Sequence, residues 1–207
     1  MIALTFLTAF AYQPLSTCGG TPTHWDGPTT WHLTQNGPMY SGLSDTEVTT
    51  AVSEGFDVWR DTTSCCSTFN HENGGNVTTE YSTNDNTNVI SFEEDNWDWS
   101  LGSVNGTIAV TFSQWAGGCV LTGGDQVYNG VGFDFTTTTN PGNGDTDLQS
   151  ITAHENGHWV GLSHSSTGSA TMYFAYQGGT GARTLHQDDE NGVCNAYPGV
   201  CGPQETD

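Results

Sequence analysis

Basic residues are almost absent from this sequence. Among its 207 residues, Arg60 and Arg183 are the only Lys or Arg, against 23 Asp and Glu, which gives a formal net charge of −21. Proteins that bind nucleic acid or an anionic membrane surface neutralise phosphates with clustered cations. We therefore expect neither nucleic acid nor a membrane among the partners of this chain.

Long apolar runs are missing as well. Beyond the first residues, no stretch is long and apolar enough to span a bilayer. Residues 1–11 form a short apolar run that ends in an A-x-A-like site, which predicts a cleaved secretory signal peptide, although the usual positive start is absent. The alternative is a buried first strand. Residues 12–207 are then a single domain, long enough to bury a substantial core.

Six cysteines form an even set, which fits an exported, oxidised protein with three disulfides. Cysteine spacing alone cannot choose among the pairings. The expected pairs are Cys194 with its near neighbour Cys201, and the adjacent Cys65 and Cys66 each with one of Cys18 and Cys119. The oxidised set predicts that the chain is extracellular.

Hydrophobic periodicity predicts three helices. Residues 44–47 read as a capping box, and the i, i+3, i+4 apolar pattern behind them predicts a helix over 45–60. Further helices are predicted over 147–160 and over 187–196, where acidic residues occupy the first turn and Pro198 follows the end.

Short runs rich in β-branched and aromatic residues predict the strands. The expected strands are 31–34, 88–92, 107–112, 124–129 and 131–135, the last two being one strand or two with a turn at 129–130. The polar stretch 136–147 is predicted to be a loop. A helix, several strands and then two helices describe an α+β domain with a mixed sheet.

The most specific pattern is residues 154–164, which read H-E-x-x-H-x-x-G-x-x-H. His154 and His158 are at i and i+4 of a helix, so they share one face and can bind one metal ion. Gly161 can adopt the conformation that ends the helix and turns the chain, which brings His164 in as a third nitrogen ligand. Three protein ligands with one position left for water are typical of a single catalytic zinc site.

Glu155 follows the first histidine and is predicted to face the same cleft. A carboxylate in this place can take a proton from the zinc-bound water and later return it to the leaving amine. Glu155 is therefore the predicted catalytic base. A purely structural zinc site would have no use for such a group.

Beyond the zinc motif, three segments match a known family. Residues 170–173 read A-T-M-Y at the spacing of a matrixin Met-turn, and 173–176 are similar to the M-Y-P-x-Y wall segment, with Phe174 in place of proline. Residues 185–193 resemble the closing helix L-x-x-D-D-x-x-G-I, and 147–150 resemble the lead into the zinc helix. The chain thus resembles a metzincin, and among metzincins a bacterial-type matrixin.

This resemblance implies a fold and several residue roles. It implies a zincin-like catalytic domain with a mixed twisted sheet, a long helix in the N-terminal half, an active-site helix and a C-terminal helix. It also implies that Met172 lies beneath the zinc ligands and that Tyr173, Phe174 and Tyr176 border the substrate pocket.

The chain departs from the family pattern at several positions. Asn156 stands where the family has an apolar residue, and a buried amide there needs hydrogen-bond partners. The histidines for a second, structural zinc are not recognisable, so we expect one zinc only. Cys18 could act as a cysteine switch on the zinc, but its surroundings lack the switch motif and a disulfide is the favoured interpretation.

Residues 140–147 carry oxygen ligands and glycines that could wrap calcium. Their spacing is not that of an EF-hand. A solvated loop is the favoured interpretation, with a Ca²⁺ site as the alternative.

Together these features predict a secreted zinc endopeptidase that cleaves protein or peptide substrates and is a monomer. An apolar substrate side chain is expected in the pocket bounded by residues 173–176. Two alternatives stay open: a non-catalytic, zinc-stabilised extracellular binding module, and a zinc hydrolase of a non-protein amide.

Overall fold

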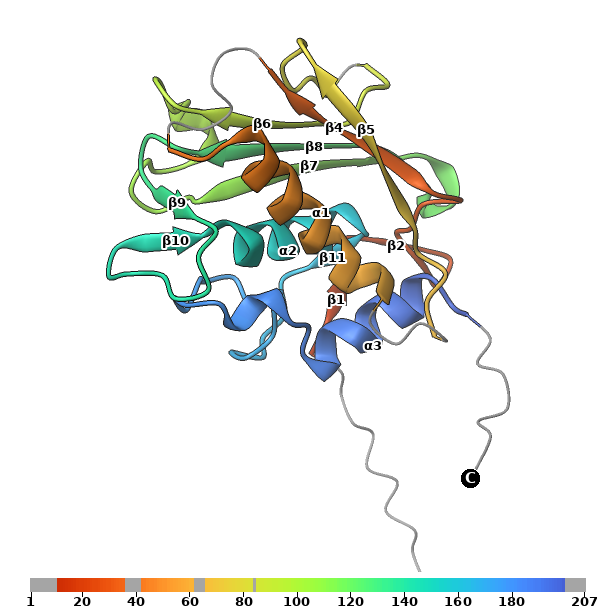
Figure 1. Cartoon of the computed structure of the whole chain (residues 1–207). Coiled ribbons are helices and arrows are strands. Elements are labelled where there is room, and N and C mark those ends of the chain that lie inside the picture. Colours follow the sequence, from red (N-terminus) through yellow and green to blue (C-terminus); the bar gives the residue numbers. More distant parts are fainter. Residues whose placement is uncertain (1–10, 36–41, 62–65, 84, 200–207) are drawn as a thin grey trace, which may run out of the picture.

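The computed structural model describes residues 11–35, 42–61, 66–83 and 85–199. Its main sheet consists of β4 (Thr29–Thr34), β5 (His71–Val77), β6 (Val89–Glu93), β7 (Ala109–Trp115) and β8 (Leu121–Asn129). Its helices are α1 (Asp45–Asp61), α2 (Leu148–Trp159) and α3 (Gln187–Ala196). Helices α1 and α2 cover one face of the sheet, and α3 lies beyond them, farther from the sheet (Figure 1). The predicted α+β architecture is confirmed.

The sheet has the order β5-β4-β6-β8-β7. All neighbouring strands are parallel except β7, which pairs antiparallel with β8 and forms one edge of the sheet. Three two-stranded pairs complete the chain: β1 (Gln13–Pro14) with β11 (Leu162–Ser163), β2 (Thr17–Cys18) with β3 (Thr21–Pro22), and β9 (Asp134–Thr136) with β10 (Asp145–Asp147). Short 3₁₀ turns are η1 (Trp99–Leu101), η2 (Gly117–Cys119) and η3 (Gly181–Arg183).

The predicted helices agree closely with the structure, whereas one strand of the main sheet and the short strands β1, β2, β3, β10 and β11 were not predicted. Helix α3 has the predicted bounds, α1 is one residue longer, and α2 lies within the predicted 147–160. Strand β5 was not predicted because its middle residues are polar or glycine and exposed, so it carries no apolar alternation. The predicted loop over 136–147 contains β10, and the strand expected over 131–135 is limited to β9.

Helix α1 begins at the predicted capping box. The Ser44 N–H donates to Glu47 Oε2 at 2.8 Å, and the Glu47 N–H donates to Ser44 Oγ at 3.3 Å. Its apolar face is buried against the sheet and α2, and comprises Val48, Ala51, Val52, Phe56 and Trp59. Trp59 Nε1 donates to the Ala153 carbonyl at 2.8 Å, so the two helices are joined by a polar contact inside an apolar interface.

Asn156 has the hydrogen-bond partners that its burial requires. Its Oδ1 accepts from Gln126 Nε2 at 3.0 Å, and its Nδ2 donates to the Val52 carbonyl at 3.4 Å. Gln126 Oε1 in turn accepts from the Tyr128 hydroxyl at 2.8 Å. The amide that departs from the family pattern therefore links α2 to both β8 and α1.

The disulfides differ from the expected pairing. Cys18 is bonded to Cys119, and Cys66 is bonded to Cys194. Cys194 therefore does not pair with its near neighbour Cys201, which lies, like Cys65, outside the described residues. The Cys18 bond also contradicts the cysteine-switch alternative.

Long-range backbone pairing explains the second disulfide. The Thr68 N–H donates to the Tyr197 carbonyl at 2.9 Å, and the Gly199 N–H donates to the Cys66 carbonyl at 2.8 Å. These contacts bring the segment after α1 alongside the end of α3. The short distance between Cys194 and Cys201 in the sequence therefore predicted the wrong disulfide.

The start of the described chain is tied to the segment that follows α2. Strand β1 pairs antiparallel with β11, and the Leu15 N–H donates to the Gly161 carbonyl at 2.8 Å. Residues 1–10 of the expected signal peptide lie outside the described residues. Among the helices of the described part, none has the length and apolar character needed to cross a membrane.

Replacing Asn156 by leucine is expected to destabilise the fold by about 1–3 kcal/mol, because the Gln126 amide then loses its partner inside the core. Urea unfolding measures the effect. The double variant with Gln126→Leu removes both partners, so it is expected to cost less than the sum of the single variants. Additive costs would show that the two amides do not interact.

Asp125 gives the fold a pH dependence. Burial raises the pKa of Asp125 to about 6, the backbone N–H of Val89 opposes the rise, and nearby Asp85 adds to it. Between pH 3.8 and about 6 the folded state therefore holds a proton that the unfolded state has released, so stability falls as the pH rises through this range. Asp125→Asn is expected to remove this part of the pH dependence of thermal unfolding. Parallel pH profiles for both proteins would contradict the assignment.

Candidate metal centre

Helix α2 is fixed at both ends. At its start, Asp147 is the N-cap and its Oδ2 accepts from the Ser150 N–H at 2.9 Å. At its end, Gly161 has a φ of +102°, and a side chain there would collide with the Thr23 backbone. The predicted glycine turn is therefore present, and it directs the chain through β11 to His164.

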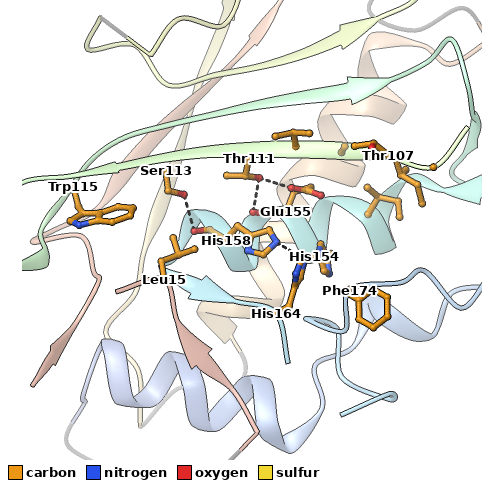
Figure 2. A pocket seen from close by; sticks show the side chains of 15 residues that line it. Leu15, Thr107, Thr111, Ser113, Trp115, His154, Glu155, His158, His164 and Phe174 are labelled. Carbon is orange, nitrogen blue, oxygen red and sulfur yellow. Dashed lines mark hydrogen bonds between the residues drawn. The ribbon is translucent and has the colours of Figure 1, made fainter. Parts of the chain in front are cut away.

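The three predicted ligands meet at one point. The ring centroids of His154, His158 and His164 lie 4.8 to 5.3 Å apart, and their ligand atoms all lie within 4.8 Å of one another. His158 Nε2 is 3.2 Å from His164 Nε2. Figure 2 shows the three rings converging beneath β7. Among the described residues, this is the one group of three or more His, Cys, Asp or Glu side chains so arranged.

Backbone carbonyls orient two of the rings. His154 Nδ1 lies 2.7 Å from the Thr171 carbonyl, and His158 Nδ1 lies 2.8 Å from the Leu162 carbonyl. A carbonyl only accepts, so each Nδ1 carries the proton and each Nε2 keeps a lone pair for a metal. Burial lowers the pKa of His158 to about 3, and His154 adds to the effect, so the ring is neutral at physiological pH. Neutral imidazoles facing one point fit zinc.

Glu155 lies beside this centre and is 5 % exposed. Its Oε2 is 2.6 Å from the Thr111 hydroxyl on β7. Burial raises the pKa of Glu155, while His154 and the Thr111 hydroxyl oppose the rise. A raised pKa makes a carboxylate a stronger base, which suits it to accept a proton.

Met172 is fully buried, and its sulfur lies next to Gly157 of helix α2. The site depends on Gly157, because a Cβ there would overlap the Met172 sulfur and the Trp59 ring. The role implied for Met172 as an apolar floor agrees with this position and stays a prediction. Gly157, the fourth residue of the motif, was not singled out from the sequence.

The acidic pair at the start of α3 holds the segment that carries Met172. Asp189 is buried and accepts the N–H groups of Thr171, Met172 and His186, at 2.8, 3.1 and 2.9 Å respectively. Its neighbour Asp188 accepts the hydroxyl of Ser165, the residue after His164, at 2.6 Å. The closing helix thus fixes both the methionine turn and the chain next to the third histidine.

A cleft of about 540 Å³ passes over the histidines. Strand β7 and the three residues before it form one side of the cleft, with residues 106–111, Ser113 and Trp115. Leu15 and Trp115 lie to one side of the histidines and Phe174 to the other (Figure 2). The cleft is therefore bordered by side chains on both sides of the candidate metal centre.

The three predicted pocket residues occupy different places. Phe174 lines the cleft and is 66 % exposed. Tyr173 packs its ring on Phe174, with centroids 4.6 Å apart. The Tyr176 hydroxyl accepts from the Asp147 N–H at 3.1 Å and donates to the Gly179 carbonyl at 2.7 Å, which ties this segment to the start of α2.

The loop considered for calcium leads into the N-cap of α2. Asp147 is completely buried and paired with the Arg183 guanidinium, whose Nε is 2.9 Å from Asp147 Oδ2. Asp145 Oδ2 accepts from the Gly142 N–H at 2.8 Å. The ion pair commits Asp147 to the helix start, and no spacing in the sequence indicated it.

The residues of β7 that contact α2 were not predicted from the sequence. Thr111 contacts Glu155, and the Ser113 hydroxyl donates to the His158 carbonyl at 3.1 Å. Strand alternation places positions 111 and 113 on one face, but the direction of that face becomes known only from the packing.

Asp189→Ala is expected to lower the free energy of unfolding by about 3 kcal/mol or more, because three backbone N–H groups lose their acceptor in the interior. Glu190→Ala removes the same charge from the same helical turn and is expected to cost less than about 1 kcal/mol. Chemical denaturation of both variants makes the comparison. Equal losses would mean that Asp189 acts only through the helix dipole.

Comparison with known proteins agrees with this geometry. Interstitial collagenase A of Mus musculus is 30% identical over 167 residues, which are 80% of this chain and 32% of the collagenase. Metalloendoproteinase 5-MMP of Arabidopsis thaliana is 43% identical over 53 residues, 26% of this chain and 15% of that protein. The chain spans a third or less of the length of these curated relatives. Residues 8–198 match the matrixin family model, Peptidase_M10, and the chain therefore belongs to the matrixin family of metalloproteases.

Proposed function

We propose that this chain is a secreted, monomeric zinc endopeptidase that cleaves protein or peptide substrates. The observation that carries the proposal is a buried carboxylate, Glu155, next to three converging histidines in a cleft that is lined by the edge strand β7. His154, His158 and His164 would hold the zinc. When bound, zinc supplies a positive charge that polarises a peptide carbonyl and favours deprotonation of water.

Glu155 performs the proton transfers in this proposal. Its carboxylate accepts a proton from the attacking water, whose oxygen adds to the carbonyl carbon of the substrate. The same group then gives the proton to the nitrogen of the leaving amine as the C–N bond breaks. The raised pKa of Glu155 supports the first step, because burial makes the carboxylate a stronger base toward the proton of the water.

The free edge of β7 supports a peptide as the substrate. Among the described residues the strand pairs only with β8, and its other side lines the cleft. An extended peptide can bind such an edge through main-chain hydrogen bonds. The cleft is bordered on both sides of the histidines, which supports cleavage within a chain rather than at its end (Figure 2).

The substrate side chain next to the cleaved bond is proposed to be apolar. Ile108, Ile151 and Phe174 line the cleft, and Tyr173 and Tyr176 support the segment that carries Phe174. Apolar surfaces of this kind bind aliphatic or aromatic side chains.

The proposed location and domain boundary rest on the disulfides and the sequence. Cys18–Cys119 and Cys66–Cys194 join distant parts of the chain, as is usual in proteins of oxidising compartments. We propose residues 1–11 as the signal peptide and 12–207 as the catalytic domain.

The test uses the purified full chain with zinc, assayed on casein and on a peptide library. Glu155→Ala is expected to lower kcat about 100-fold or more while zinc is still bound, and chelation is expected to abolish activity until zinc is restored. The matched control Glu54→Ala removes an exposed carboxylate of α1, far from the cleft, and should leave activity intact. A zinc-loaded wild-type protein that cleaves nothing, or a Glu155→Ala variant as active as the wild type, would refute the proposal. The first outcome would favour a non-catalytic zinc module or a non-protein amide as substrate.

A further inference from the structure

Strand β7 contacts helix α2 through two hydroxyl groups (Figure 2). Ser113 donates to a backbone carbonyl, which any hydroxyl at that position could reach. Thr111 differs because its oxygen is 2.6 Å from Oε2 of Glu155, the predicted base. This contact joins a side chain of the cleft edge to the reacting group itself.

We propose that Thr111 is a positioning residue for Glu155. In this role, which rests on the proposed endopeptidase function, the Thr111 hydroxyl donates to Oε2 and holds the carboxylate in one orientation. The other oxygen, Oε1, then remains to exchange the proton with water and with the leaving amine.

The lengths of the contacts indicate where the Thr111 proton goes. The hydroxyl has a single proton and two acceptors within reach, Glu155 Oε2 at 2.6 Å and the Glu155 carbonyl at 3.2 Å. A length of 2.6 Å is typical of a hydroxyl that donates to an ionised carboxylate. The carbonyl lies within α2 and already accepts a helical N–H.

The position of Thr111 in the sheet makes it a rigid support. Thr111 is directly opposite Gln126 in the β7–β8 ladder, and Gln126 donates to Asn156 at 3.0 Å. The adjacent helix residues Glu155 and Asn156 are thus each held by one member of a cross-strand pair. A flexible glutamate needs such a partner, because ordering its side chain at each turnover would cost conformational entropy.

The test separates positioning from stability with three variants. Thr111→Val keeps the shape and removes the hydroxyl, so kcat is expected to fall about tenfold with KM changed less than about twofold. Thr111→Ser restores a hydroxyl and is expected to bring kcat back to within about twofold of the wild type. If Thr111→Val does not fold, Thr111→Ala takes its place, because it also removes the hydroxyl, and the same fall in kcat is expected.

Thr152→Val is the matched control. Thr152 is a buried hydroxyl of the same helix, and it donates to the Ala51 carbonyl at 2.9 Å on the side away from the cleft. Its loss is expected to lower the melting temperature and leave kcat unchanged. A fall in kcat equal to that of Thr111→Val would show that any loosening of α2 has this effect, and would overturn the proposal.

A structural readout is independent of turnover. Crystal structures should show the Glu155 carboxylate in one position in the wild type and in more than one position in Thr111→Val. A single shared position, or wild-type kcat in Thr111→Val, would overturn the positioning role. Absence of peptidase activity in the wild type would instead refute the proposed function, so the two failures are distinguishable.

Discussion

Helix α2 carries His154, His158, the buried carboxylate of Glu155 and the buried amide of Asn156, so its rotation about its own axis determines where all four groups point. The buried polar contacts prevent that rotation. Asn156 is bonded to β8 and to α1, and Glu155 is bonded to β7. Apolar packing alone could tolerate a small turn of the helix, whereas directional hydrogen bonds in a dry interior do not.

The third histidine depends on a different set of contacts. His164 lies beyond the helix, and its position follows from the glycine turn at Gly161 and from Ser165, which is bonded to Asp188. Asp189 holds the turn whose Thr171 carbonyl orients His154. A helix near the C-terminus therefore sets the geometry of ligands that come earlier in the chain, and the metal centre is a product of the whole domain.

Local signals allowed much of this to be predicted from the sequence. The capping box, the acidic first turn of α3 and Gly161 act over a few residues, and each element lies where these signals placed it. Strand β5 and the disulfide partners depend on segments that meet only in the folded state, so spacing gave no strand for the first and the wrong partners for the second. The partners of Asn156 and the contact of Thr111 were hidden for the same reason, because a residue type does not reveal what lies opposite it.

The pairing of β1 with β11 has a consequence for the order in which the site can form. Leu15, which borders the cleft, directly follows β1, and the partner of β1 is β11, next to the third histidine. Cys18 pairs with Cys119, which lies 101 residues later in the chain. Asp188 and Asp189 arrive later still. During synthesis Leu15 is therefore made long before His164 and before the turn that carries Met172. Incomplete synthesis therefore leaves the candidate metal centre without the contacts that position His164 and the turn of Thr171.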